Sequence, residues 1–384
     1  MPQHRAAITT RLGAFYAASF LVVGIQTPFW PAWLSGRGLD AQEIAALFAA
    51  GIRAKVAATP LIGAAADRLG NRRVVMTALA AVACLAYAAL WPKWGFWGLL
   101  WMNLVAGVAQ SALMPLGDSI TLAAVRGSGL DYGRIRISGS LTFIVAAVGS
   151  GALLGGQAAA ASGNLVLALV LAASAVLVAA CCWIPLGPAA TGRARWAALA
   201  RFAADRRFWL FVASGSAVQA SHQLYYGFGT LYWQELGFAD AVIGGLWAEG
   251  VVAEIVLFWY GAPVVARVGP LGLMALGGLA GVVRWSLLGV VPGLAAAALL
   301  QLLHGLTFGA THLGAMHFMA RTVPPGAAAS AQSLYAAVSA GLGSGLVMLA
   351  AGALYRAYSG QAYLFMAALS AAGLVGIVVL SWRR

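Results

Sequence analysis

The sequence predicts an all-α membrane protein, with twelve transmembrane helices in two pseudo-symmetric six-helix bundles. Of its 384 residues, 62% are hydrophobic and only 9% are charged, whereas about 25% of the residues in a soluble domain carry a charge. Apolar runs long enough to cross a hydrocarbon core of ~30 Å recur along the whole chain. The two halves of the sequence also repeat a pattern of glycine, arginine and aromatic residues at a constant interval.

The repeat is clearest in two short charged stretches. Arg68 and Arg267 are separated by the same number of residues as Gly70 and Gly269, and this interval is close to half of the chain. Other pairs at the same interval are Gly38 with Gly237, Ile44 with Ile243, and Trp33 with Tyr232. A constant interval of this length indicates one structural unit used twice, the form that parallel repeats take in membrane transporters.

Twelve apolar segments follow one another, many of them interrupted by glycine or proline. The predicted spans are 12–34, 44–63, 74–91, 97–124, 135–157, 164–184, 208–232, 241–264, 271–290, 294–320, 327–352 and 359–382. Small residues let helices approach closely, and neighbouring groups satisfy a broken backbone bond. We expect an N-terminal bundle over 1–184 and a C-terminal bundle over 208–384. The arginine-rich linker between them, 185–207, is expected to lie on anionic headgroups on the cytoplasmic side, with a regulatory partner site as the alternative.

The positive charges predict the orientation of the chain in the membrane. Most of the 23 Lys and Arg residues fall on one side. The exceptions on the opposite side are Arg37, Lys93 and Arg356, and those inside spans are Arg53, Lys55 and Arg284. Because cytoplasmic loops carry the excess of positive charge, we expect a multi-pass protein of the plasma (inner) membrane with both termini in the cytoplasm. Nothing before the first span reads as a cleaved signal, so we expect that span to be retained.

The same placement of charge excludes other classes of partner. A net charge of +13 would indicate nucleic acid in a soluble protein, but here it is an orientation signal, so we expect no nucleic-acid partner.

Cys84, Cys181 and Cys182 lie in apolar runs and are expected to be packing residues, with no metal site. There is no phosphate-binding loop and no Gly-x-Ser-x-Gly elbow. We therefore expect a protein that is not an enzyme, has no cofactor and is not driven by ATP. We also expect it to be a monomer.

A charged hinge bounded by glycines joins the second and third spans, from Gly63 to Arg73. We expect Gly63 to allow close helix contact and Asp67 to pair with a neighbouring helix end, where a carboxylate meets the positive end of the helix dipole. The arginines are expected to bind headgroups or acidic partners. The simpler interpretation is a positive loop, and the stronger one is a conformational latch formed by Gly63, Asp67, Arg68, Gly70, Arg72 and Arg73.

This spacing, Gly-x-x-x-Asp-Arg-x-Gly-x-Arg-Arg, resembles the signature loop of the major facilitator superfamily. The resemblance covers the whole chain, because the repeat, the number of spans and the loop positions all agree. It implies alternating access between two six-helix bundles around a central cavity.

Ionisable residues inside the spans are candidates for function, because each costs ~2.5–3.5 kcal/mol at the centre of a membrane. In the N-terminal half, Asp118 lies near the cytoplasmic part of the fourth span and Arg136 near the start of the fifth. An ion pair between them would neutralise both charges and could exchange its internal partner for a substrate. Lys55 is either a cation lining the cavity or a partner for an acidic residue such as Asp118.

The segment around Asp118 and Arg136 is similar to lactose permease-type proton symporters, with Pro115 and Gly133 in register. In that family the matching carboxylate and arginine contact the substrate, which implies the same role here. The family's tryptophan seven residues after the arginine is replaced by Phe143, which argues against a galactoside.

In the C-terminal half, Glu249 and Glu254 lie on the eighth span and face different directions. We expect Glu254 to face the cavity, where desolvation favours its protonated form. Arg284 and His304 follow on the next two spans and would complete a proton-coupling triad; the alternative is a network that only fixes packing. The permease-type coupling carboxylate three residues after the histidine is absent, because Thr307 stands there. A coupled proton must then be carried by Glu254, Glu249 or Asp118.

Several strings in both halves resemble the branch of the superfamily that contains the 3-phenylpropionic acid transporter. They include Gly250-Val-Val-Ala-Glu254 and Gly281-Val-Val-Arg-Trp285. The resemblance implies proton-driven uptake of a small organic solute, with an aromatic carboxylic acid such as a phenylpropanoid as the first expectation and Tyr225 as a candidate ring contact. The alternatives are a nucleoside or sugar symporter, an exporter of drugs or metabolites, and a receptor or scaffold with a transporter fold.

Overall fold

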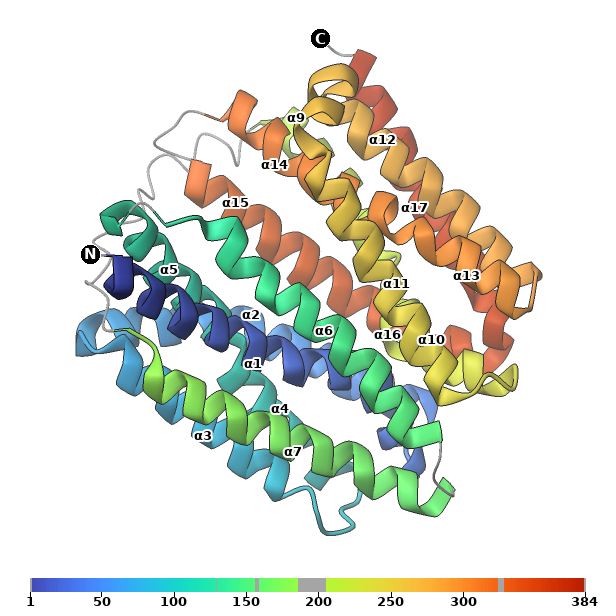
Figure 1. The fold of residues 1–384 in the computed structure, drawn as a ribbon. Coiled ribbons are helices and arrows are strands. Elements are labelled where there is room, and N and C mark those ends of the chain that lie inside the picture. The colour runs from blue at the N-terminus through green and yellow to red at the C-terminus, as the bar shows by residue number, and fades with distance from the viewer. Residues whose placement is uncertain (1, 129, 156–158, 186–204, 324–327, 383–384) are drawn as a thin grey trace. The chain divides into compact units, whose positions relative to one another are not determined.

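The computed structural model describes residues 2–128, 130–155, 159–185, 205–323 and 328–382, which are helical and contain no strand within these ranges. The predicted all-α class is therefore confirmed (Figure 1). The helices of the N-terminal part are α1 (Pro2–Gly36), α2 (Ala41–Leu69), α3 (Arg72–Ala88), α4 (Phe96–Ser111), α5 (Leu113–Ser128), α6 (Tyr132–Gly155) and α7 (Ala159–Trp183). The predicted linker 185–207 lies almost entirely outside the described residues. Its predicted contact with lipid headgroups therefore stays a prediction.

The C-terminal part is also helical, but its helices are more often interrupted. They are α9 (Arg206–Ala220), α10 (Gln223–Glu235), α11 (Asp240–Trp259), α12 (Gly261–Val290), α13 (Leu294–Leu302), α14 (Thr311–Thr322), α15 (Ala328–Ala336), α16 (Ser344–Tyr358) and α17 (Tyr363–Trp382). Two π-helical segments, Gly305–Ala310 and Ala337–Gly343, and a 3₁₀ turn, Ser359–Ala362, connect helices in this part.

Among the described residues, nine segments are long and apolar enough to cross a membrane, compared with twelve predicted spans. The difference has three physical sources. The helix α3 has 17 residues, fewer than the ~20 that a span ordinarily needs. The predicted seventh span is divided between α9 and α10, and the segment Ala331–Trp382 contains two predicted spans in one apolar run of 52 residues.

The chain divides into two compact units. One comprises Met1–Glu43, Arg53–Thr191 and Ala239–Ala248, and the other comprises Ile44–Ile52, Gly192–Phe238 and Glu249–Arg384. Two short segments, Ile44–Ile52 and Ala239–Ala248, are thus grouped with the unit that the other half of the sequence mainly forms. The predicted domain bounds of 1–184 and 208–384 stay a prediction.

In the first unit, α1 packs most extensively against α6 and α7, alongside which it runs in Figure 1. Glycine makes the contact with α6 close, because a Cβ atom added at Gly24 would lie 2.8 Å from the carbonyl oxygen of Phe143 and 3.0 Å from its Cα. Backbone atoms at this distance cannot move aside. Gly24 therefore lets the two helices approach closely, as small residues do in membrane helix pairs.

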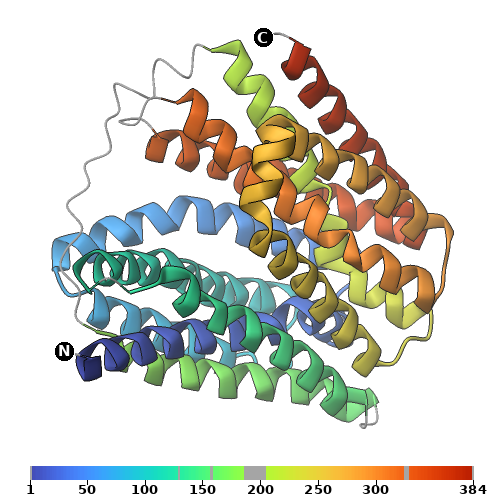
Figure 2. The same cartoon turned by 45° about the horizontal axis from the view of Figure 1, so that its top comes forward.

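In the second unit, α17 packs against both α12 and α9, and α12 also packs against α14 (Figure 2). A buried apolar cluster joins these helices, and among its members are Phe211, Met274, Met319 and Leu380. This packing buries the face of α12 that carries Arg284, whereas its opposite face, with Leu279 and Val283, is exposed.

The sequence repeat corresponds to a repeat in backbone geometry. Both Gly38 and Gly237 have positive φ values, of 93° and 81°. Gly38 N–H donates to the carbonyl of Ser35 at 2.9 Å, and Gly237 N–H donates to that of Gln234 at 2.9 Å. The following residue in each half also donates to a carbonyl five residues back. These are matched Schellman motifs, so equal spacing in the sequence reflects the same helix ending used twice.

The second repeated pair shares a positive φ but not the whole conformation, because ψ is −7° at Gly70 and 167° at Gly269. Gly70 ends α2 with φ 69°, and Gly269 has φ 76° and breaks the helical conformation within α12, immediately before Pro270. The predicted boundary between the eighth and ninth spans thus lies inside α12 as a kink. Glycine is needed at both positions because other residues rarely adopt a positive φ.

Candidate functional site

A buried hydrogen-bonded network in the second unit joins three predicted coupling residues. His304 Nε2 lies 2.8 Å from Glu254 Oε1, and Arg284 Nη1 lies 2.9 Å from His304 Nδ1. The side chain of Glu254 is 19% exposed, that of His304 is 7% exposed, and Arg284 is fully buried. The sequence prediction that Glu254 is the carboxylate of this group agrees with these contacts.

The hydrogen bonds determine which tautomer of His304 is present. A guanidinium group can only donate, so Nδ1 of His304 must accept from Arg284. A neutral imidazole then carries its proton on Nε2 and donates it to the carboxylate of Glu254. The result is a directed chain of hydrogen bonds from a buried cation, through a neutral ring, to a carboxylate.

Residues of α13 and the segment after it complete the contacts of the guanidinium. Arg284 Nη2 donates to Gln301 Oε1 at 2.6 Å, and Nη1 donates to Thr307 Oγ1 at 3.1 Å. Thr307 lies 3.0 Å from Nε2 of His222, whose Nδ1 donates to a backbone carbonyl at 3.1 Å. Gln301, His304 and Thr307 are spaced by three residues, and all three contact Arg284. This polar spacing within an apolar span is the sequence signal that would have identified Gln301.

Glycines allow α11 to approach these residues. A Cβ atom at Gly305 would lie 2.7 Å from the carbonyl oxygen of Ala253, and one at Gly250 would lie 3.3 Å from the ring of His304. Close approach of the two backbones brings His304 within reach of Glu254. The other predicted carboxylate, Glu249, has no hydrogen bond or ion pair among the described residues, so its predicted place in the coupling group is not supported.

Tyr225 is buried beside this network. Arg284 lies 4.9 Å from the centre of its ring, and Gln301 Nε2 donates to its hydroxyl at 2.9 Å. The ring is 1% exposed. Its predicted role in lining a site for an aromatic substrate is therefore wrong for this conformation, because Arg284 covers the ring.

The second polar group lies in the first unit, around Asp118. Its Oδ1 accepts hydrogen bonds from the hydroxyls of Tyr16 at 2.6 Å and Tyr132 at 3.1 Å. The guanidinium of Arg136 lies 5.3 Å from the ring centre of Tyr16 and 4.2 Å from that of Phe20. The predicted ion pair between Asp118 and Arg136 is wrong, since no such pair occurs in the described part of the chain. Tyr16 contacts both residues and lies between them.

Two further predicted substrate residues lie apart from Asp118. Phe143 is 6% exposed and takes part in the close contact of α6 with α1. Lys55 lines a separate pocket of the first unit and makes no ion pair with Asp118 or any other carboxylate that the structure describes. Of the two alternatives for Lys55, a cavity cation is the one that agrees with its position.

The latch residues form a compact set of contacts between helix ends. Arg72 is 6% exposed and donates from Nη2 to Asp67 at 2.6 Å and from Nη1 to Ser119 at 2.9 Å. Arg73 donates to the carbonyl of Ile184 at 2.7 Å. Asp67 thus pairs with the first residue of α3, as predicted for a carboxylate near a helix end.

One latch residue, Gly63, differs from expectation. A Cβ atom added at Gly63 would have nothing within 4 Å, so its predicted role in close helix contact is wrong. Arg72 pairs with an acidic side chain, which is one of the two expected kinds of partner, and Arg73 binds a backbone carbonyl. Arg68 is exposed, and its predicted role stays a prediction.

Comparison with known proteins shows the family. The model of the MFS_1 like family matches residues 9–367. The chain is 30% identical over 370 residues to the probable 3-phenylpropionic acid transporter of Escherichia coli (strain K12), which covers 94% of this chain and 95% of that protein. It is 27% identical over 386 residues to the maltose permease of Geobacillus stearothermophilus, covering 99% and 96%.

Among solved structures, that of the nucleoside transporter NupG has a TM-score of 0.84 at 19% identity, covering 97% of this chain and 99% of that one. This likeness shows the fold. The relatives are transporters and not enzymes, which confirms the prediction of a multi-pass membrane transporter without enzymatic activity. The chain belongs to the MFS_1-like family of major facilitator superfamily transporters.

Proposed function

We propose that this secondary transporter takes up an aromatic carboxylic acid, such as a phenylpropanoid, together with a proton. The observation that carries the proposal is the buried chain Arg284–His304–Glu254. An arrangement of a cation, a neutral histidine and a carboxylate is costly at membrane depth, and apolar packing would stabilise the unit without it. The name of the 30% identical relative supports the substrate class.

Glu254 carries the proton in this proposal. Protonation of His304 on Nδ1 would remove the acceptor of Arg284 and would leave two cations 2.9 Å apart. Protonation of Glu254 avoids both costs. The side chain of Glu254 is more exposed than that of His304, and it retains a hydrogen bond to Nε2 of His304. A proton on Glu254 leaves the charge of Arg284 unbalanced, and this change links the proton to a rearrangement of the unit.

Substrate contacts belong to the first unit in this proposal. Asp118 and Arg136 supply polar contacts, Lys55 supplies a cation, and Phe143 becomes available when the helices around it move. The two bundles, 1–184 and 208–384, alternate access to the substrate, and the latch around Arg72 opens in each cycle. The protein acts as a monomer in the inner membrane, with both termini in the cytoplasm.

The test is uptake of labelled 3-phenylpropionate into proteoliposomes with and without an imposed pH gradient. Wild-type protein should accumulate the acid only with an inward proton gradient. Glu254→Gln should abolish accumulation and retain exchange of internal for external acid, because a carboxamide cannot carry a proton. Asp131→Asn, which changes an exposed carboxylate, should accumulate the acid as wild type does.

Other outcomes would contradict the proposal. Accumulation by Glu254→Gln at the wild-type level would exclude Glu254 as the carrier, and loss in Glu249→Gln alone would transfer that role to Glu249. Gradient-driven uptake of labelled maltose or uridine in place of the acid would assign a sugar or a nucleoside as the substrate. Absence of any solute flux would favour a receptor with this fold.

A further inference from the structure

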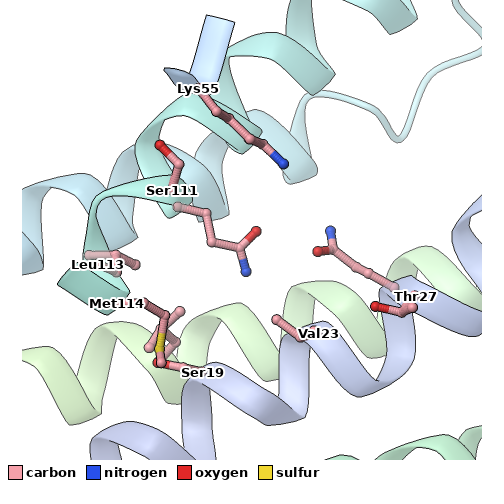
Figure 3. A pocket seen from close by; sticks show the side chains of 11 residues that line it. Ser19, Val23, Thr27, Lys55, Ser111, Leu113 and Met114 are labelled. Carbon is pink, nitrogen blue, oxygen red and sulfur yellow. The ribbon is translucent and has the colours of Figure 1, made fainter. Parts of the chain in front are cut away.

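A pocket of about 300 Å³ lies within the first unit, between α1, α2, α4 and α5, with one side chain from α7. Ligand pockets for small molecules are roughly 300–1,000 Å³, so this one suits a small ligand. Figure 3 shows Lys55 entering the pocket from one side and Ser19, Val23 and Met114 on the other. The pocket therefore has a cationic side and a largely apolar side.

The cation is held over a glycine. A Cβ atom added at Gly107 of α4 would lie 3.0 Å from Cε of Lys55 and 3.6 Å from its Nζ. The missing side chain thus leaves room for the lysine stem to cross α4. No carboxylate lies within ion-pair distance of Lys55 in the part of the chain that the structure describes. An ammonium group at membrane depth is costly without an anion.

Polar groups around the pocket are oriented to donate. The hydroxyl of Tyr87 donates to Oε1 of Gln110 at 3.0 Å, which leaves the amide N–H₂ group of Gln110 to bind an oxygen atom. Ser19, which also lines the pocket, is 4% exposed, and its Oγ has no hydrogen-bond partner in the described structure.

Two other cations among the candidate site residues, Arg284 and Arg136, are already engaged. Arg284 donates to His304, Gln301 and Thr307, and Arg136 lies against the rings of Tyr16 and Phe20. Neither residue lines this pocket. Lys55 is thus the cation that the pocket presents to a ligand.

We propose that this pocket binds the carboxylate of a small acid with an apolar tail. The ammonium of Lys55 and the amide of Gln110 bind the carboxylate oxygens, and the tail lies against Val23, Leu113 and Met114. The proposal deepens the proposed function and rests on it for the identification of this acid as the transported solute. Binding of the acid itself needs no proton gradient.

The test is calorimetric titration of purified protein in detergent with 3-phenylpropionate, benzoate and hexanoate, and with the amide of each acid. Wild-type protein should bind at least one acid more tightly than its amide. Lys55→Gln should weaken binding of that acid by roughly tenfold or more, as expected for loss of a hydrogen bond to a charged group, and should leave the amide unaffected. Lys55→Arg should restore most of the affinity.

Two matched controls distinguish the pocket from general effects of charge and of helix packing. Arg53→Gln removes an exposed positive charge from the same helix and should bind as wild type does. Gly107→Ala should weaken acid binding, because its methyl group would displace the stem of Lys55. Gly149→Ala, at a helical glycine with nothing within 4 Å, should not.

The proposal is overturned if every acid binds wild-type protein no better than its amide, a comparison that requires no variant to fold. It is also overturned if Lys55→Gln binds the acid as wild type does. Lysine-dependent binding without gradient-driven uptake would refute the proposed function alone. Gradient-driven uptake with unchanged binding by Lys55→Gln would refute this site alone.

Discussion

Arg284 is a fully buried cation whose direct hydrogen-bond partners are neutral side chains. Its guanidinium lies 4.5 Å from the ring centre of Trp285 and 4.9 Å from that of Tyr225. Its hydrogen bonds go to Gln301, His304 and Thr307, and the nearest balancing charge is Glu254, beyond the imidazole of His304. A planar group with several fixed donors suits this position better than an ammonium would.

A double-mutant cycle tests the coupling between these two charges. Arg284→Gln should lower stability by roughly 1–3 kcal/mol, because it leaves the carboxylate of Glu254 without a balancing charge. Arg284→Gln combined with Glu254→Gln should cost less than the sum of the two single variants, by about 0.5–3 kcal/mol. Thermal or denaturant unfolding in detergent measures these values. Additive losses would show that the imidazole does not connect the two charges.

The cycle has an internal comparison in an exposed pair. Arg134 Nε lies 3.8 Å from Asp131 Oδ2, with both side chains largely exposed. Exposed pairs contribute little, so the corresponding cycle at Arg134 and Asp131 should give a coupling near zero. A large coupling there would indicate that the assay responds to net charge.

At the scale of helices, matched endings and breaks define the repeat. The helices α1 and α10 are each followed by a Schellman motif with the same hydrogen bonds, at Gly38 and at Gly237. The predicted seventh span is broken between Ala220 and Gln223, and the tenth contains the π-helical segment Gly305–Ala310. These breaks lie next to the buried network, where His222 contacts Thr307 and Thr307 accepts a hydrogen bond from Arg284.

The helix endings make a testable prediction. Gly38→Ala and Gly237→Ala should each cost about 1–2 kcal/mol, because alanine is strained at a positive φ. Gly36→Ala, in the last turn of α1 with nothing within 4 Å of an added Cβ, should be neutral or stabilising. Unfolding midpoints of the three variants in detergent measure the difference. Equal effects of Gly36→Ala and Gly38→Ala would contradict the argument from backbone strain.

At the scale of the whole molecule, the orientation in the membrane is a prediction from the distribution of charge. Positive residues concentrate in the segments predicted to be cytoplasmic, and the opposite side carries few, such as Lys93. Both Lys93 and Arg68 are exposed, so each position is accessible to a reagent in water. The two residues should therefore face opposite sides of the membrane.

Cysteine labelling in cells checks this orientation. In a background where Cys84, Cys181 and Cys182 are replaced by alanine, Lys93→Cys should react with a membrane-impermeant maleimide added to intact cells. Arg68→Cys should react only after the cells are permeabilised. The opposite pattern would mean that the distribution of positive charge does not determine the orientation of this chain.

The sequence by itself determined the all-α membrane class, the internal repeat and the three ionisable residues of the buried chain Arg284–His304–Glu254. The class and the repeat follow from the composition and from the spacing of residues in the sequence. Ionisable residues are rare in apolar spans because each costs free energy in a membrane, so Glu254, Arg284 and His304 stand out as exceptions. The contacts of Arg284 with His304, and of His304 with Glu254, were thus foreseeable as a group, although their order was not.

Only the tertiary structure decided which neutral groups complete each site. Tyr16 and Asp118 are 102 residues apart in sequence, and nothing in the chain marks the tyrosine as the partner that replaces the predicted Arg136. The donors around Lys55 are equally inconspicuous, because serine, glutamine and tyrosine residues occur in many apolar helices. Their roles depend on how each helix is rotated about its axis. Close contacts such as that of Gly24 with Phe143 set this rotation, and a single sequence does not show which faces will meet.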